Sequence, residues 1–83
     1  MHYIIMCRSL TYAQRAERLL ERAGIYSGLT KAPQGITPEG CTFGVKLQAK
    51  HVQRALAVMR GAGVKTGKIF RIAEEGKAEE VRI

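Results

Sequence analysis

A stretch at the end of the first helical segment of this chain is repeated in its second half. Leu20–Gly28 reads Leu-Glu-Arg-Ala-Gly-Ile-Tyr-Ser-Gly, and Met59–Gly67 reads Met-Arg-Gly-Ala-Gly-Val-Lys-Thr-Gly. A glycine directly after a helix can adopt the left-handed conformation that ends the helix, and the apolar residue after it packs back onto the helix. The repeat therefore predicts two similar halves, each containing one helix that ends at Ala-Gly.

Both repeats follow an amphipathic stripe, in which apolar residues recur every three or four positions as they do on one face of a helix. The first stripe consists of Ala13, Ala16, Leu19, Leu20 and Ala23. The second consists of Val52, Ala55, Leu56, Met59 and Ala62. We expect the hydroxyls of Ser9 and Thr11 to cap the first helix, and the second helix to begin at about Ala49.

Four segments have the apolar or alternating pattern of β-strands: Tyr3–Arg8, Ile25–Lys31, Cys41–Leu47 and Gly67–Ile72. The stretch Ala32–Gly40 holds two Pro and two Gly and is predicted to be a loop. The element order is thus β-α-β-β-α-β. Right-handed crossovers then give an α+β, ferredoxin-like fold, whose antiparallel sheet has the order 4-1-3-2 with both helices on one face.

The chain has 83 residues, enough for one small domain with a thin core. We place this domain at residues 1–73 and interpret residues 74–83 as a charged C-terminal tail, whose order the sequence leaves open. Residues 1–73 have a net charge of +9 and the tail has −2. A basic body of this kind attracts nucleic acids, acidic proteins or small anions, although a basic surface can also serve solubility alone.

The predicted topology brings several reactive groups to one end of the sheet. Because strands 1 and 3 are antiparallel neighbours, Cys41 and Gly40 should lie near Cys7, Arg8 and the Ser9–Thr11 helix start. A helix N-terminus and a guanidinium both lower the pKa of a nearby thiol, and the thiolate is the reactive form. We therefore predict Cys41 as the functional thiol and Cys7 as a core residue that can pair with it transiently. The alternative is that Cys41 is an inert residue at a strand start.

Several classes of function are not favoured by the sequence. The four candidate metal ligands are His2, Cys7, Cys41 and His51, and they lack C-x-x-C or H-x-x-x-H spacing. No phosphate-binding glycine motif occurs, so we predict no metal and no cofactor. Tyr3 and Phe43 are not embedded in an RNA-binding pattern, and nucleic-acid binding is not favoured. The sequence has no apolar stretch of membrane-spanning length and no secretory signal at its start, which predicts a cytoplasmic protein without membrane attachment.

Three groups of residues are distinctive when taken together, namely Ser9-Leu10-Thr11, Leu19-Leu20-Glu21-Arg22-Ala23-Gly24-Ile25, and Pro33 with Ile36-Thr37 and Cys41. Through them, and over residues 3–72, the sequence resembles a family of small bacterial proteins described as selenium/sulfur carrier-like. Gln34 and Thr42 stand where the family usually has Arg and Gly. The resemblance implies that Cys41 is the carrier thiol.

The leading hypothesis is a carrier that holds sulfur or selenium on Cys41 as a persulfide or selenosulfide, and delivers it to a partner enzyme. Gly40, Arg8, Ser9, Thr11 and Cys7 would surround the thiol. Such a chain is a carrier or binding protein rather than an enzyme, and its partner is the donor or acceptor protein. Two alternatives stay open, namely a binding or regulatory module for an anionic ligand or protein, with a homodimer as one form, and weak RNA binding through the basic surface.

Overall fold

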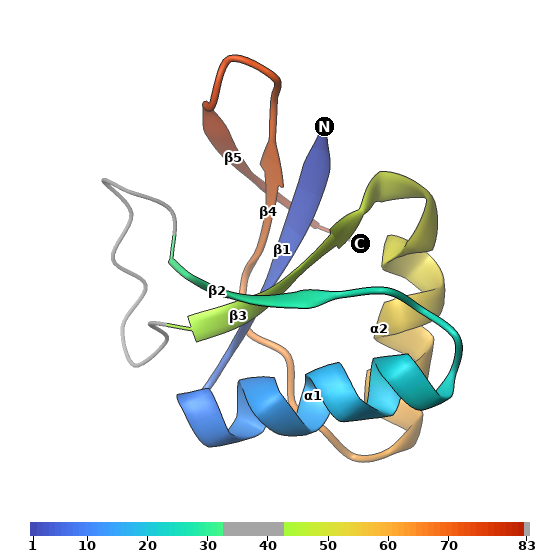
Figure 1. Cartoon of the computed structure of the whole chain (residues 1–83). Coiled ribbons are helices and arrows are strands. Elements are labelled where there is room, and N and C mark those ends of the chain that lie inside the picture. The colour runs from blue at the N-terminus through green and yellow to red at the C-terminus, as the bar shows by residue number, and fades with distance from the viewer. Residues whose placement is uncertain (33–42, 83) are drawn as a thin grey trace.

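The chain folds into one antiparallel sheet with two helices, an α+β arrangement seen in a computed structural model that describes residues 1–32 and 43–82 (Figure 1). The strands are β1 (His2–Cys7), β2 (Gly28–Lys31), β3 (Phe43–Gln48), β4 (Ile69–Ile72) and β5 (Ala78–Val81). The helices are α1 (Leu10–Arg22) and α2 (Val52–Gly61), the latter preceded by a short 3-10 turn, η1 (Ala49–His51).

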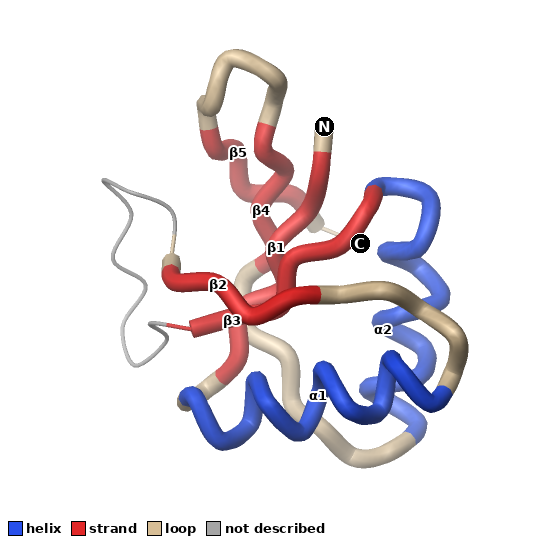
Figure 2. The backbone as a smooth tube through the Cα atoms, in the orientation of Figure 1, coloured by secondary structure: helices blue, strands red, loops and turns tan. Residues whose placement is uncertain are grey.

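The sheet has the order β2-β3-β1-β4-β5, with antiparallel pairing between all neighbours (Figure 2). The expected sheet of four strands is therefore wrong in strand number, because a fifth strand extends the run 4-1-3-2 beyond β4. This strand comes from the segment that the sequence suggested as a charged tail. A turn that includes Gly76 reverses the chain after β4. The N–H of Gly76 donates a hydrogen bond to the carbonyl of Ala73 at 2.8 Å.

Two ion pairs join β5 to β4 and to the residue directly before β4. The Arg71 guanidinium bonds the Glu79 carboxylate at 2.7 Å, and the Lys68 ammonium lies 3.8 Å from the Glu80 carboxylate. The two glutamates of β5 thus pair with one cation on β4 and with one directly before it. Val81 adds a partly buried apolar contact to the helix-side core.

The main core lies between the helices and one face of the sheet. Alternation along β1 directs Ile5 and Cys7 to this face, and alternation along β3 directs Phe43, Val45 and Leu47 to it. They meet the buried stripes of both helices, formed by Ala13, Ala16, Leu20, Val52, Ala55, Leu56 and Met59. The opposite face has a smaller buried cluster of Ile4, Met6 and Phe70.

The repeated Ala-Gly segments end the two helices in the same way, as predicted. Gly24 and Gly63 have φ values of +79° and +76°. Gly24 and Ile25 donate to carbonyls three and five residues earlier, at 3.0 and 2.8 Å, and Gly63 and Val64 do the same at 3.1 and 2.9 Å. This pair of bonds defines the Schellman motif. Because Ile25 is buried at the helix end, the second strand begins at Gly28 and not at Ile25.

Candidate functional site

The end of β1, the start of β3 and the N-terminus of α1 meet at one end of the sheet. Cys7, the last residue of β1, pairs with Phe43, the first residue of β3. Ser9 is the N-cap of α1, and its hydroxyl accepts a hydrogen bond from the backbone N–H of Tyr12 at 3.4 Å. We call Cys7–Thr11 the β1–α1 junction. Gly40 and Cys41 lie outside the described residues, and Cys41 precedes Phe43 by two positions in the sequence.

Cys7 is a core residue, as interpreted from the sequence. Its exposed fraction is 0%, and its side chain belongs to the apolar cluster between the sheet and the helices. The thiol lies 3.7 Å from the carbonyl oxygen of Ile5, in a weak hydrogen bond. A buried thiol in apolar surroundings does not meet reagents or partner proteins unless the fold opens. Cys7 in this conformation therefore cannot exchange a group with another protein.

The other predicted residues of the junction take three different positions. Arg8 is exposed directly after β1, Ser9 is half-buried at the cap, and Thr11 is exposed in the first turn of α1. The first turn of α1 contains no acidic side chain. The positive pole of the helix dipole is therefore not neutralised by its own first turn, and it favours an anion or a thiolate nearby.

The structure adds a neighbour that the sequence analysis missed, namely the connection between α2 and β4. Two small hollows of about 190 and 230 Å³ lie beside Arg8, and Lys65 lines both of them. Tyr12 lines the first hollow, and Thr66 lines the second. Two cationic side chains, from segments more than fifty positions apart, thus share one surface at the junction.

Backbone hydrogen bonds hold this connection against β1. The N–H of Gly67 donates to the carbonyl of Met6 at 2.7 Å, and the N–H of Met6 donates to the carbonyl of Lys68 at 2.9 Å. The contact between β1 and the residues before β4 could have been predicted from the sequence. Since β4 is an antiparallel neighbour of β1, the residues before β4 must lie beside the end of β1, by the same rule that was applied to β3.

No grouping of metal ligands and no membrane-spanning helix occurs in the part of the chain that the structure describes. Within residues 1–32 and 43–82, no three His, Cys, Asp or Glu side chains are grouped as metal ligands would be. Neither α1 nor α2, the helices described, has the length and apolar character that crossing a bilayer requires. The pKa of His2 is lowered by desolvation and by the charges of Lys46 and the N-terminus, but His2 begins β1, at the opposite end from the junction.

Comparison with known protein families places this chain in one of them. The sequence model of the family "Putative Se/S carrier protein-like" matches residues 2–71, which is most of the chain. The chain belongs to this selenium/sulfur carrier-like family. Searches of the curated proteins and of the solved structures gave no match. The family match includes the β1–α1 junction and the connection before β4, and it stops before β5.

Proposed function

We propose that the protein carries a sulfur or selenium atom on Cys41, as a persulfide or selenosulfide, and passes it to a partner enzyme. Membership of the carrier-like family is the observation on which this proposal depends. The chain has two cysteines, and the burial of Cys7 leaves Cys41 as the candidate for exchange with another protein.

The surroundings of Phe43 support a reactive thiol at this position. Phe43 lies at the end of the sheet where β1 gives way to α1, and it is two residues from Cys41 in the sequence, a stretch of chain that spans at most about 7 Å. Arg8, Lys65 and the N-terminus of α1 supply positive potential at this end. Positive potential stabilises a thiolate over a thiol, and the thiolate is the species that attacks sulfur.

The transfer conserves atoms and electrons without an added oxidant. The Cys41 thiolate attacks the terminal sulfur of a donor protein's persulfide, so that a new S–S bond forms while the donor S–S bond breaks. The donor leaves as a thiolate, and the transferred sulfur keeps its oxidation state. An acceptor nucleophile then attacks the terminal sulfur on Cys41 and releases the Cys41 thiolate. A selenium atom follows the same path through a selenosulfide.

The test is intact-mass spectrometry after incubation with a cysteine desulfurase and cysteine, and separately with a selenocysteine-cleaving donor and selenocysteine. We expect the mass to rise by one sulfur or one selenium atom. Cys41→Ser should abolish the adduct, and Cys7→Ala is the matched control that should keep it. No adduct on the wild type, or an adduct that persists in Cys41→Ser, would refute the proposal.

The electrostatic part of the proposal has its own measurement. In the Cys7→Ala background, alkylation rates across a pH range report the pKa of the Cys41 thiol. We expect a value below the ordinary thiol value of about 8.5, and we expect Arg8→Gln and Lys65→Gln to raise it. Arg15→Gln, on the exposed side of α1, is the matched control. A pKa at the ordinary value, unchanged by these substitutions, would contradict a thiolate-stabilising role for the junction.

RNA binding by base stacking on the sheet is less well supported by the structure. Tyr3 and Phe43, the aromatic residues of β1 and β3, both pack against the helix-side core. Neither is therefore placed on the opposite face of the sheet, where RNA-binding sheets of similar topology stack bases. We propose instead a cytoplasmic shuttle with a protein donor and a protein acceptor. A reducing compartment would keep its thiol ready for exchange.

A further inference from the structure

A hollow lies at the other end of α1 from the β1–α1 junction, where the chain leaves the helix and runs into β2 (Figure 1). It has a volume of about 420 Å³, and we call it the α1–β2 hollow. Its lining consists of Glu17, Glu21, Ile25, Tyr26 and Ser27. Sites for small molecules commonly have volumes from about 300 Å³ upward, so the α1–β2 hollow has room for an organic ion.

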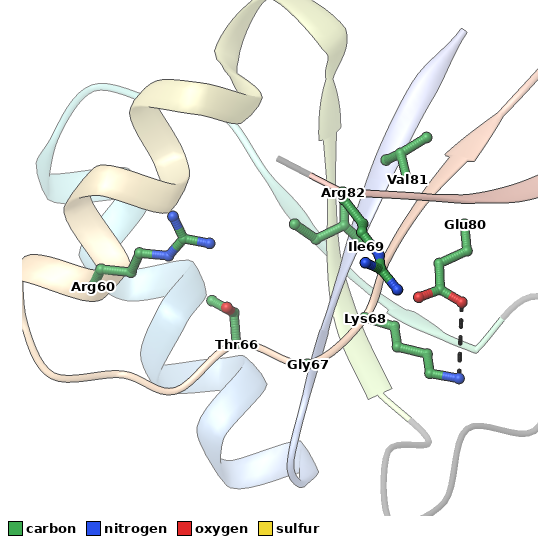
Figure 3. Close-up of a pocket in the computed structure, with 8 residues that line it drawn as sticks. All are labelled: Arg60, Thr66, Gly67, Lys68, Ile69, Glu80, Val81 and Arg82. Carbon is green, nitrogen blue, oxygen red and sulfur yellow. Dashed lines mark ion pairs between the residues drawn. The ribbon is translucent and has the colours of Figure 1, made fainter.

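The two carboxylates of the α1–β2 hollow have no cationic partner. Glu17 and Glu21 are four residues apart in α1, so they are neighbours on one face of the helix, where like charges repel each other. In the part of the chain that the structure describes, neither carboxylate forms an ion pair, not even with Arg18, three residues before Glu21. The glutamates of β5 differ in this respect, as Figure 3 shows for Glu80 and its partner Lys68.

The rest of the sequence holds no cation that could change this balance. Residues 33–42 and 83, which lie outside the described ranges, contain no Lys, Arg or His. All cationic side chains of the protein are therefore among the described residues, and none of them forms an ion pair with Glu17 or Glu21. A cation bound between these carboxylates offsets their mutual repulsion.

Two other groups in the lining indicate what kind of cation fits. The hydroxyl oxygen of Ser27 is buried and has no hydrogen-bond partner among the described residues. A buried polar atom of this kind calls for an explanation, such as a water or an ion that completes its hydrogen bonds, and a hydroxyl oxygen can accept from an N–H donor. The Tyr26 side chain is 85% exposed, and the face of an aromatic ring attracts organic cations.

We propose that the α1–β2 hollow binds a small organic ammonium ion. The ammonium group meets the carboxylates of Glu17 and Glu21, and the Ser27 hydroxyl is a further acceptor for its N–H groups. The carbon part of the ligand lies against Tyr26. This site shares no residue with the β1–α1 junction, so it is independent of the proposed thiol chemistry.

The experiment is a titration of the ¹⁵N-labelled full chain with benzylammonium, followed by amide chemical shifts at constant ionic strength. Benzyl alcohol, which has a similar shape and no charge, is run in parallel. We expect saturable shifts concentrated in Glu17–Glu21 and Ile25–Ser27 with benzylammonium, and no saturation with benzyl alcohol over the same concentrations. Cys41→Ser should bind benzylammonium as the wild type does, which separates this proposal from the carrier proposal.

Three variants decide whether the α1–β2 hollow is the site. Glu21→Gln should weaken benzylammonium binding about five-fold, the loss of one charged contact at a partly solvated site. Tyr26→Leu should weaken it about three-fold, because the aromatic face is lost while an apolar side chain remains. Glu75→Gln, which removes an exposed carboxylate in the turn between β4 and β5, is the matched control and should change binding by less than about two-fold.

Three results would each overturn the proposal. The first is a set of linear shifts spread over the acidic residues of the whole chain, which indicates unspecific ion pairing. The second is an equal effect of Glu21→Gln and Glu75→Gln. The third is benzyl alcohol binding as tightly as benzylammonium, since the carboxylates would then contribute nothing.

Discussion

Gly44 is the position at which adding a single methyl group should most clearly disturb the sheet. It lies in β3 opposite Met6, and a Cβ atom built on it would lie 2.6 Å from the Ile5 carbonyl oxygen and 3.1 Å from Ile4 Cγ2. Ordinary contacts of a Cβ atom begin at 3.4 Å. The Ile5 backbone cannot easily move away, because β1 pairs with β3 on one side and with β4 on the other.

We expect Gly44→Ala to lower the free energy of unfolding by about 1–2 kcal/mol. Overpacking of this kind costs about 1–3 kcal/mol, and the smaller freedom of alanine in the unfolded chain returns about 0.4–1 kcal/mol. For a domain of this size each kcal/mol corresponds to a Tm change of about 4–8 °C. Thermal and urea unfolding followed by circular dichroism measure both quantities.

Gly28→Ala is the matched control for this prediction. Gly28 also lies in a strand, β2, but a Cβ atom there would have nothing within 4 Å. We expect its Tm to equal that of the wild type or to exceed it slightly. If Gly44→Ala melts no lower than Gly28→Ala, the argument from the close approach of β3 to β1 is wrong.

Three further predictions concern the helix ends and pH. Gly63→Ala should cost about 1–2 kcal/mol of unfolding free energy, because alanine is strained at a φ of +76°; urea unfolding measures it. Ser9→Ala should cost about 0.5–1 kcal/mol by the same assay, since its cap bond is long at 3.4 Å. The pKa of His2 is lowered in the folded chain, so just below pH 6.5 the unfolded chain binds more protons than the folded chain. The contribution of His2 therefore leaves the free energy of unfolding undiminished above pH 6.5 and lowers it as the pH drops below 6.5. His2→Gln should flatten this decline, as shown by urea unfolding at about pH 7.5 and about pH 5.5.

The helices and their ends could be predicted because local chemistry decides them. The stripe before Gly24 and the one before Gly63 have the period of a helix, and the Ala-Gly segment after each stripe ends it in the predicted way. The N-terminal cap at Ser9 could likewise be predicted, because a serine hydroxyl caps helices. Predicting these features requires only the residues close by in the sequence.

The strands at the two edges of the sheet were harder to predict, because tertiary contacts decide their extent. Ile25 has the character of a strand residue, yet it is buried where the chain leaves α1 and so lies outside β2. Ala78–Val81 contains two adjacent glutamates and has the composition of a solvated tail. It is a strand because its backbone pairs with β4 across the sheet. The glutamates meet Arg71 on β4 and Lys68 directly before it, a pairing that no local pattern reveals.

The candidate site was predicted in part. The antiparallel rule correctly placed Cys7 beside the start of β3, and the order of the chain placed Arg8 and Ser9 next to it. Lys65 was missed because the rule was not applied to β4, which approaches β1 from the other side. The position of Cys41 relative to these residues stays a prediction.

The pairing of β5 with β4 has a consequence for the dynamics of the protein. Its two ion pairs join side chains that are 37–64% exposed, and exposed pairs contribute little stability and weaken with salt. Val81 is the β5 side chain that packs against the main core, whereas β1 has buried residues along most of its length. We therefore expect β5 to open without unfolding of the rest of the domain, so that its amide protons exchange faster than those of β1. We expect this difference in exchange rate to grow as the ionic strength rises. A protein built in this way can open one edge of its sheet while its two helices and the remaining strands stay folded.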